Sequence, residues 1–358
     1  MTVSEIRSNP AIAAVDLFCG AGGLSHGLLH EDIAVKAGFD VDPICKYAYE
    51  YNNGAPYIIK DVAKLSGKDI KKYLSDADFT LIAGCAPCQP FSTYTHGKDN
   101  SSDSKWGMLY EFSRLVQEVT PHIVTMENVP QLVKHDVFND FVTCLENVGY
   151  YVSYKVVFCP DYGIPQTRQR LVLLASQYGH IELINPDMTF KKLPSVRDAI
   201  GHLPPISHGQ QDDNDPLHKS QGLSDINVRR IQESKPDGSW KDWSEELVAE
   251  CHKKEKGATY GSVYGRMSWD KPAPTITTQF TGFGNGRFGH PEQDRALSLR
   301  EGAILQTFPE NYEFVKPGNQ VYLSHVAKMI GNAVPVTLGK IIAKSIKIHL
   351  RDKYGKPE

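Results

Sequence analysis

A segment with two cysteines carries the residue types best suited to nucleophilic chemistry. It reads Gly84-Cys85-Ala86-Pro87-Cys88-Gln89-Pro90-Phe91-Ser92 and directly follows an apolar run. A cysteine thiolate is a strong nucleophile, and the two prolines restrict the backbone on either side of Cys88. We therefore predict that Cys88 is a catalytic nucleophile at the carboxyl end of a strand.

The same Cys-x-x-Cys pair has other interpretations. It is also typical of a redox dithiol or of half a zinc site. No second pair and no histidine cluster at metal spacing accompanies it, so we predict no metal site. A redox role would leave the glycine-rich segment described next unexplained. A buried structural cysteine is the commonest alternative, and we prefer it for Cys85.

A glycine-rich turn near the start of the chain predicts a nucleoside-binding loop. The run Asp16-Leu17-Phe18-Cys19-Gly20-Ala21-Gly22-Gly23-Leu24-Ser25 ends an apolar stretch, where glycines let the backbone approach a ligand closely. Asp40 lies 20 residues after Gly20, a spacing at which a carboxylate can hold ribose hydroxyls. The third glycine of a dinucleotide loop is missing, which favours a ligand without pyrophosphate, such as S-adenosylmethionine.

A second acid-containing pair supports this cofactor. Asp61-Val62 ends the third predicted strand and offers a carboxylate for an adenine amine and an apolar side chain for its ring. The alternative is a plain tight turn with Asp40 as a helix cap, and the glycines alone do not separate the two. Acids at the ends of two strands favour the cofactor.

The elements that position these residues read as a parallel sheet with crossover helices. Two further strands, close enough to form a hairpin at the sheet edge, follow the first five. The predicted strands are Ala13–Phe18, Val35–Asp40, Tyr57–Ile59, Phe79–Ala83, Ile123–Met126, Tyr150–Phe158 and Leu171–Ser176. After about Pro186 the chain is rich in Gly, Pro, Asp and Lys, which predicts a separate, loop-dominated domain.

The C-terminal part of the chain turns regular again from Arg295. An amphipathic helix is predicted over Pro335–Leu350. Its predicted core-facing residues are Val336, Leu338, Ile341, Ile342 and Ile346.

Bulk properties limit the class of protein without naming a function. The chain has 358 residues, 41% hydrophobic and 23% charged, and a formal net charge of -3. If it binds nucleic acid, it must use a local basic face. Seven cysteines without a disulfide-like framework indicate a reducing cytoplasm. We find no signal peptide and no run approaching the roughly 18 apolar residues of a membrane span, so we expect a cytoplasmic protein with no membrane partner.

Six ordered motifs give a specific resemblance. Pro87-Cys88-Gln89, preceded by Asp16 to Gly23, resembles the DNA (cytosine-5) methyltransferase family of bacterial type. The resemblance covers the chain except roughly Pro186 to Arg287, which corresponds to the family's variable target-recognition region. The other agreeing segments are Glu127-Asn128-Val129, Gln166-Thr167-Arg168-Gln169-Arg170, Arg295 to Glu301, and Gly331-Asn332-Ala333-Val334.

The resemblance implies a fold and a division of the chain. We expect an α/β, Rossmann-like S-adenosylmethionine-dependent methyltransferase fold with a second, smaller, loop-rich target-recognition domain. Residues 1–185, completed by 331–358, would form the catalytic and cofactor-binding domain. Residues 186–298 would recognise the target, and 299–330 would form a hinge.

The expected reaction explains the other catalytic candidates. Addition of a thiolate to carbon 6 of cytosine makes carbon 5 nucleophilic, provided that ring nitrogen 3 is protonated or hydrogen-bonded. Glu127, after the fifth strand, is the candidate for that role because burial favours the protonated form of a carboxyl; its alternative is a helix cap. By resemblance, Arg170 would contact the cytosine carbonyl and Glu127. Arg168 would contact a backbone phosphate or belong to the active-site network. Two residues apart on a strand, both would face one cleft, although solvated surface arginines stay an alternative. No base for the carbon 5 proton is named, so a water and a side chain both stay open.

Further residues are assigned to ligands. The base must leave the duplex to react, and the polar segment from Ser92 to Lys105 is expected to close over DNA as a lid, with an idle loop as the alternative. DNA contacts are expected at Ser92, Arg266, Gln279 and Arg287, where a structural Gly-rich loop is the alternative. By resemblance Leu109, Asn332 and Ala333 also contact the cofactor. The full cofactor set is Phe18, Gly20, Gly22, Gly23, Leu24, Asp40, Val41, Asp61, Val62, Pro87, Leu109, Asn332 and Ala333.

Two other functions stay open beside a sequence-specific DNA methyltransferase. A tRNA cytosine-5 methyltransferase shares the chemistry, although a separate recognition region favours double-stranded DNA. A catalytically silent DNA-binding homologue is disfavoured by the intact Cys88, Glu127 and Arg170. We expect a monomer, with a cognate restriction endonuclease in the same system as a possible partner.

Overall fold

The computed structural model describes residues 11–87, 107–186 and 192–354. The chain divides into two compact units and passes between them more than once. Unit 1 comprises Met1–Phe158, Gln169–Pro186 and Val334–Glu358, and unit 2 comprises Cys159–Arg168 and Asp187–Ala333. The expected hinge, 299–330, therefore lies within unit 2. The expected lid, like Cys88 and Ser92, lies outside the described residues.

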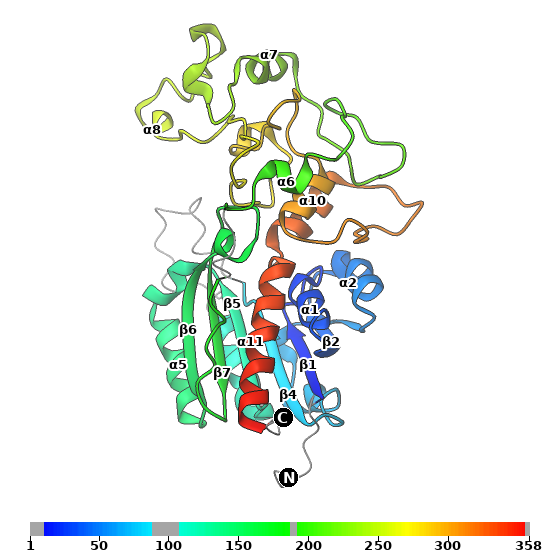
Figure 1. Cartoon of the computed structure of the whole chain (residues 1–358), viewed down its shortest axis with the longest axis vertical. Helices are drawn as coiled ribbons and strands as arrows, with labels where there is room; N and C mark the ends of the chain where they lie inside the picture. The colour runs from blue at the N-terminus through cyan, green and yellow to red at the C-terminus, as the bar shows by residue number, and fades with distance from the viewer. Residues whose placement is uncertain (1–10, 88–106, 187–191, 355–358) are drawn as a thin grey trace. The chain divides into compact units, whose positions relative to one another are not determined.

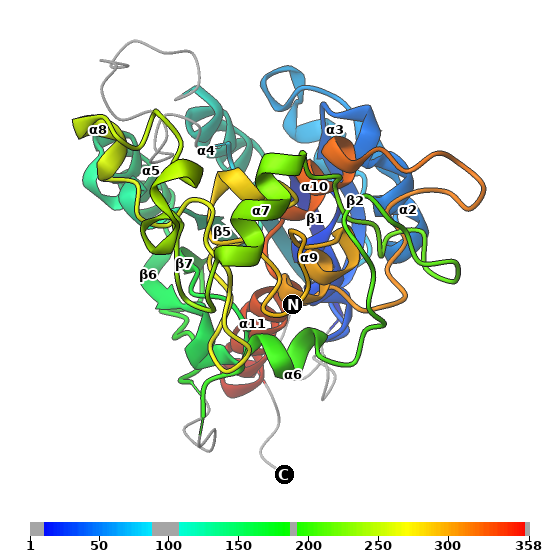
Figure 2. The ribbon, with the colours of Figure 1, turned by 90° about the horizontal axis from the view of Figure 1, so that it is seen from above.

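Unit 1 is built on a seven-stranded sheet in the order β3-β2-β1-β4-β5-β7-β6. Seen end-on in Figure 2, the labelled strands follow one another from β6 through β7 and β5 to β1 and β2. The first five strands are parallel, whereas β7 runs antiparallel to β5 and to β6. The strands are β1 (Ile12–Leu17), β2 (Ala34–Asp40), β3 (Tyr57–Ile59), β4 (Phe79–Gly84), β5 (Ile123–Asn128), β6 (Tyr151–Phe158) and β7 (Gln169–Ser176).

All seven predicted strands are confirmed, with ends displaced by two residues or fewer. The β6–β7 hairpin closes one edge of the sheet, as expected. Strands β1, β4 and β5 are buried along almost their whole length, which their continuous apolar sequence requires in a sheet covered on both faces. The sheet therefore brings the carboxyl ends of β1 to β5 to one edge, where the candidate residues begin.

Helices cover both faces of this sheet. Figure 2 shows α4 and α5 on one face and α11 on the other, and α11 packs against α1. Contact between α1 and α11 is so close that a Cβ on Gly27 would lie 2.6 Å from Cα of Gly339. The unit 1 helices are α1 (Gly23–Leu29), α2 (Lys46–Asn53), α3 (Gly67–Lys71), α4 (Gly107–Val119), α5 (Asp136–Asn147) and α11 (Val336–Tyr354).

The predicted C-terminal helix is confirmed as α11, which extends four residues further than expected. Four of its five predicted core residues are buried, whereas Ile341 is half-buried. One stretch among the described residues, Leu323–Lys353, is long and apolar enough to cross a membrane, contrary to our expectation. Most of its apolar window is buried, as in the core helix of a soluble protein, so this stretch is weak support for a membrane span.

Unit 2 consists mainly of loops around short helices (Figure 1). A small core containing Trp240, Trp243 and Phe283 compensates for the scarcity of regular structure. A fully buried ion pair between Arg295 and Glu301, with two N–O distances of 2.7 Å, fixes the start of α9. The α-helices of unit 2 are α6 (Val196–Ile200), α7 (Asp225–Glu233), α8 (Glu255–Ala258), α9 (Leu299–Leu305) and α10 (Leu323–Asn332).

Candidate active site

The predicted glycine loop connects β1 to α1 through residues of positive φ. Phe18, Gly20 and Gly22 have φ values of 59°, 49° and 90°, and Gly22 is the N-cap residue of α1. A Cβ built on Gly20 would meet no atom within 4 Å among the residues that the structure describes. The glycine is therefore required by the backbone conformation, and the space beside it is open to a ligand.

Acidic side chains lie at the ends of the next two strands. Asp40 accepts the backbone N–H of Gly20 at 2.9 Å and that of Asp42 at 3.0 Å, so it fixes the loop instead of capping a helix. Beside it, the side chain of Val41 is 61% exposed. Asp61 does cap a short helix, through the N–H of Ala63. Carboxylate oxygens, an exposed apolar side chain and an open glycine turn fit the nucleoside of S-adenosylmethionine.

The remaining candidates for cofactor binding have varied environments. Gly23 and Leu24 are buried in the first turn of α1, and Leu109 is buried in α4. Val62 is buried directly after Asp61, and Pro87 is exposed. In unit 2, Asn332 is exposed at the end of α10 and is followed by the buried Ala333.

A buried polar network behind the glycine loop was missed from the sequence. The hydroxyl of Ser25 donates to Oδ2 of Asp16 at 2.6 Å and lies 2.9 Å from the Tyr49 hydroxyl. Burial raises the pKa of Asp16 to about 7, against the lowering effect of the Ser25 hydrogen bond. The sequence signal for this network was an acid within an apolar strand. The network connects β1 with α1 and α2.

Glu127 lies at the carboxyl end of β5 and is 2% exposed. Its Oε1 is 2.8 Å from Nε of Arg170, on β7, and its Oε2 accepts the thiol of Cys85 at 3.1 Å. Cys85 is only partly buried, so our interpretation of it as a buried structural cysteine was wrong. This carboxyl group thus forms an ion pair with Arg170 of β7 and accepts a hydrogen bond from Cys85, the residue that follows β4.

The next residue fixes the segment that leads to the predicted nucleophile. The side-chain amide of Asn128 donates to the backbone carbonyl of Ala86 at 3.1 Å. Ala86 is two residues before Cys88, so the described part of this segment is fixed to the end of β5. These contacts bring Cys85, Glu127 and Arg170 together beside the start of the Cys88 loop.

The structure gives Arg168 a different place from the predicted one. It precedes β7 and belongs to unit 2, so it does not share a strand face with Arg170. Its side chain is buried, and its terminal nitrogens donate to the carbonyls of Ile276, Gly331 and Ala333 at 3.0, 3.4 and 3.3 Å. The prediction that both arginines lie on one strand was wrong, because β7 begins after Arg168, and the alternative of a solvated Arg168 was wrong because its guanidinium donates to buried carbonyls.

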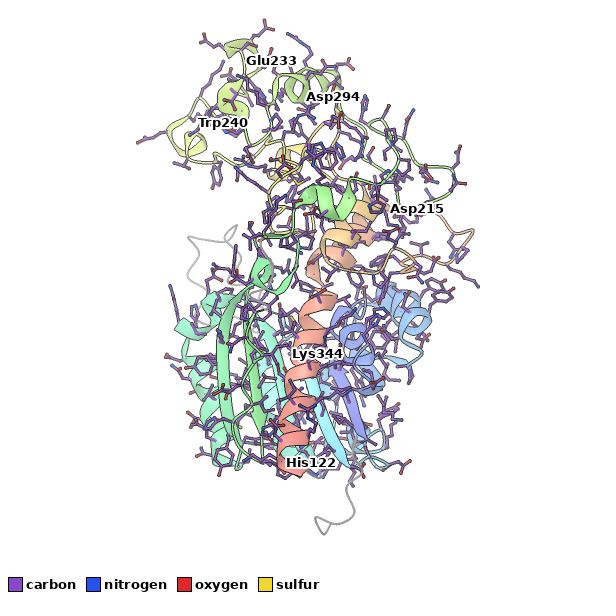
Figure 3. The ribbon with its side chains drawn as sticks, viewed as in Figure 1. His122, Asp215, Glu233, Trp240, Asp294 and Lys344 are labelled. Atoms are coloured by element: carbon purple, nitrogen blue, oxygen red, sulfur yellow. The ribbon has the colours of Figure 1, made fainter. Side chains whose placement is uncertain are left out.

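The candidate DNA-contacting residues of unit 2 also separate by burial. Arg266 is buried and donates to four backbone carbonyls and to the carboxylate of Asp294, labelled in Figure 3. These internal acceptors contradict its prediction as a DNA contact. Gln279 is exposed, and Arg287 is partly exposed while donating to the Asp237 carbonyl. Both keep side-chain surface for a ligand.

Comparison with known proteins decides the family. A model of the C-5 cytosine-specific DNA methylases matches residues 12–348. The chain belongs to this family. It is 54% identical to the Type II methylase M.HgiDII of Herpetosiphon aurantiacus, over 94% of this chain and 95% of that protein. It is 30% identical to the Type II methyltransferase M.Eco47II of Escherichia coli, over 98% and 82%.

Solved structures of other methyltransferases share the fold. A putative DNA modification methyltransferase encoded within an E. coli prophage superposes with a TM-score of 0.73 at 22% identity, covering 95% of this chain and all of that one. The S. pombe Dnmt2 methyltransferase superposes with a TM-score of 0.59 at 19% identity, covering 95% and 98%. The protein is thus a DNA (cytosine-5) methyltransferase with the expected Rossmann-like fold. Enzymes of this family take the methyl group from S-adenosylmethionine.

Proposed function

We propose that unit 1 performs the methyl transfer with Cys88 as the nucleophile and with Glu127 and Arg170 at the cytosine ring. The observation that carries this assignment is the position of the Glu127 carboxyl, which is almost fully buried, with its Oε1 2.8 Å from Nε of Arg170. It lies at the end of β5, beside the strand that continues toward Cys88. Active-site groups of open α/β sheets gather at these strand ends.

The proposed reaction begins with attack by Cys88 on the base and ends with release of Cys88. The thiolate of Cys88 forms a bond to carbon 6 of the flipped cytosine, while Glu127 donates a hydrogen bond or proton to ring nitrogen 3. The electron pair at carbon 5 would then bond to the methyl group that the cofactor supplies, and the electrons of the broken sulfur–methyl bond would stay on sulfur as a neutral thioether. Loss of the carbon 5 proton to a base then restores the 5,6 double bond and expels Cys88 as thiolate, while a proton given to nitrogen 3 returns to Glu127.

The glycine loop and the strand-end acids would hold the cofactor, which supplies an electrophilic methyl group on sulfur when bound. Asp40 would accept the ribose hydroxyls with its remaining lone pairs, and Asp61 the adenine amine. Leu109, Asn332 and Ala333 are proposed by resemblance to contact the cofactor as well. Gly20 leaves the turn open for this approach.

Unit 2 is proposed to recognise the target in double-stranded DNA through exposed side chains that include Gln279 and Arg287. We also propose that the protein acts as a monomer in the cytoplasm, where its DNA substrate lies. A cognate restriction endonuclease would cut the same target when it is unmethylated.

A covalent-trapping experiment tests the assignment. The target cytosine is first identified by bisulfite sequencing of DNA from cells that express the protein. The full-length protein is then incubated with tritiated S-adenosylmethionine and duplex DNA in which 5-fluorocytosine replaces that base. Fluorine at carbon 5 blocks the last step, so a stable protein–DNA adduct is expected. Cys88→Ala is expected to form none, and Glu127→Gln to slow methyl transfer about 100-fold or more.

Two outcomes contradict the proposal. An adduct formed by Cys88→Ala would remove that residue as the nucleophile, and an unchanged rate in Glu127→Gln would remove the carboxyl. A parallel assay with tRNA as methyl acceptor is expected to give no label.

A further inference from the structure

Cys85 lies directly opposite Glu127 because of the register between β4 and β5. Gly84 pairs with Met126 in this parallel pair, so the next residue of each strand meets across the sheet end. The backbone of Cys85 is also fixed, since its N–H donates to the carbonyl of Leu17 at 3.3 Å. Its side chain is therefore held beside the carboxyl by the geometry of three strands.

The two oxygens of Glu127 have different partners. Arg170 is 2.8 Å from Oε1 and carries a permanent charge, whereas the thiol of Cys85 donates a hydrogen bond to Oε2 at 3.1 Å. A thiol is a weak donor, so it can orient a carboxyl without competing strongly with a substrate. Oε2 is thus the oxygen that can more easily form a hydrogen bond with an incoming cytosine ring.

We propose that Cys85 is a positioning residue for the methyl transfer. Its thiol holds Oε2 of Glu127 in one orientation before the cytosine enters. The carboxyl is then already oriented for a hydrogen bond with ring nitrogen 3. This inference rests on the proposed role of Glu127. It gives the first cysteine of the Cys-x-x-Cys pair a function that needs neither a metal nor a disulfide.

The first test compares three single variants in single-turnover methyl transfer to DNA. Cys85→Ala removes the donor and is expected to slow the reaction about 3- to 10-fold, with unchanged KM for S-adenosylmethionine. Cys85→Ser restores a donor and should return the rate to within about 2-fold of the parent. Cys144→Ala is the matched control: Cys144 is also partly buried, in unit 1, and accepts a hydrogen bond from Gln117.

The second test is a double-mutant cycle with Glu127→Gln. If Cys85 acts through Glu127, then Cys85→Ala should change the rate less than about 1.5-fold in the Glu127→Gln background. The same loss in both backgrounds, or no loss in the parent, would overturn the inference. A wild-type rate in Glu127→Gln alone would instead overturn the proposed function. Equal thermal unfolding midpoints for Cys85→Ala and Cys144→Ala show that folding is not the cause.

Discussion

At the scale of single residues, burial and partners separate side chains that look alike in the sequence. Arg168 and Arg170 are two positions apart, yet Arg170 meets the carboxyl of Glu127 and Arg168 donates to backbone carbonyls of unit 2. Arg266 has a similar internal role. A guanidinium has several donors in a fixed plane, so it serves either purpose equally well.

We predict opposite main effects for the two neighbouring arginines. Arg168→Ala should lower the free energy of unfolding by about 3 kcal/mol, because buried carbonyls lose their donors. The rate of the folded fraction should stay within about 3-fold of the parent. Arg170→Ala should slow methyl transfer about 100-fold. Denaturant unfolding and single-turnover rates at low temperature measure both; a 100-fold slower but fully folded Arg168→Ala would contradict the structural role.

The buried Asp16 predicts a pH dependence of stability. Burial raises its pKa to about 7, so between about pH 4 and 7 the folded protein keeps a proton that the unfolded chain has lost. This contribution therefore weakens the fold as pH rises through that window and is constant above it. Asp16→Asn should remove roughly 2–4 kcal/mol of the decline, as measured by urea unfolding at pH 4.5 to 8. An unchanged decline would assign it to other groups.

At the scale of elements, glycine allows helices and turns to lie closer than side chains permit. Gly27 of α1 faces Gly339 of α11, and the carbonyl of Val336 would lie 2.6 Å from an added Cβ. Since α11 covers one face of the sheet, this contact helps to hold the C-terminal helix on the N-terminal half of unit 1. In the active site, the register of the parallel strands β4 and β5 likewise brings two residues together, because it fixes Cys85 opposite Glu127.

Gly27→Ala should therefore destabilise the protein by about 2 kcal/mol through overpacking, although alanine favours helices. Gly107→Ala is the control, because a Cβ at this first residue of α4 meets no atom of the described residues within 4 Å. It should be neutral or slightly stabilising. Thermal unfolding of both variants is the measurement, and equal midpoints would show that α1 and α11 can separate without cost.

For the whole molecule, two properties affect DNA binding and assembly of the units: the net charge and the path of the chain between the units. The net charge is -3, so DNA must be bound by a local arrangement of basic side chains. The chain also enters unit 2 for ten residues, Cys159–Arg168, before β7 returns to the sheet. Both units are thus built from segments far apart in the sequence.

Duplex binding should weaken steeply with salt despite the negative net charge. Each phosphate contact contributes about -0.9 to the slope of log K against log salt concentration. Arg287→Ala is expected to reduce that slope by about 1 if it meets a phosphate, whereas Gln279→Ala should leave it unchanged. Fluorescence anisotropy from about 50 to 200 mM salt measures the slope. A salt-independent affinity would contradict electrostatic binding.

Patterns in the sequence were enough to predict the strands, their order along the chain, the glycine turn and the motifs that place this protein in its family. These features depend on periodicity and spacing over short distances, which the chain carries locally. Which polar groups meet could be seen only in the folded chain. Cys85 and Glu127 are 42 residues apart, and the Asp16–Ser25–Tyr49 network joins three elements. Such partners are chosen by sheet register and by burial, because a buried polar group must find a hydrogen bond wherever the fold brings one.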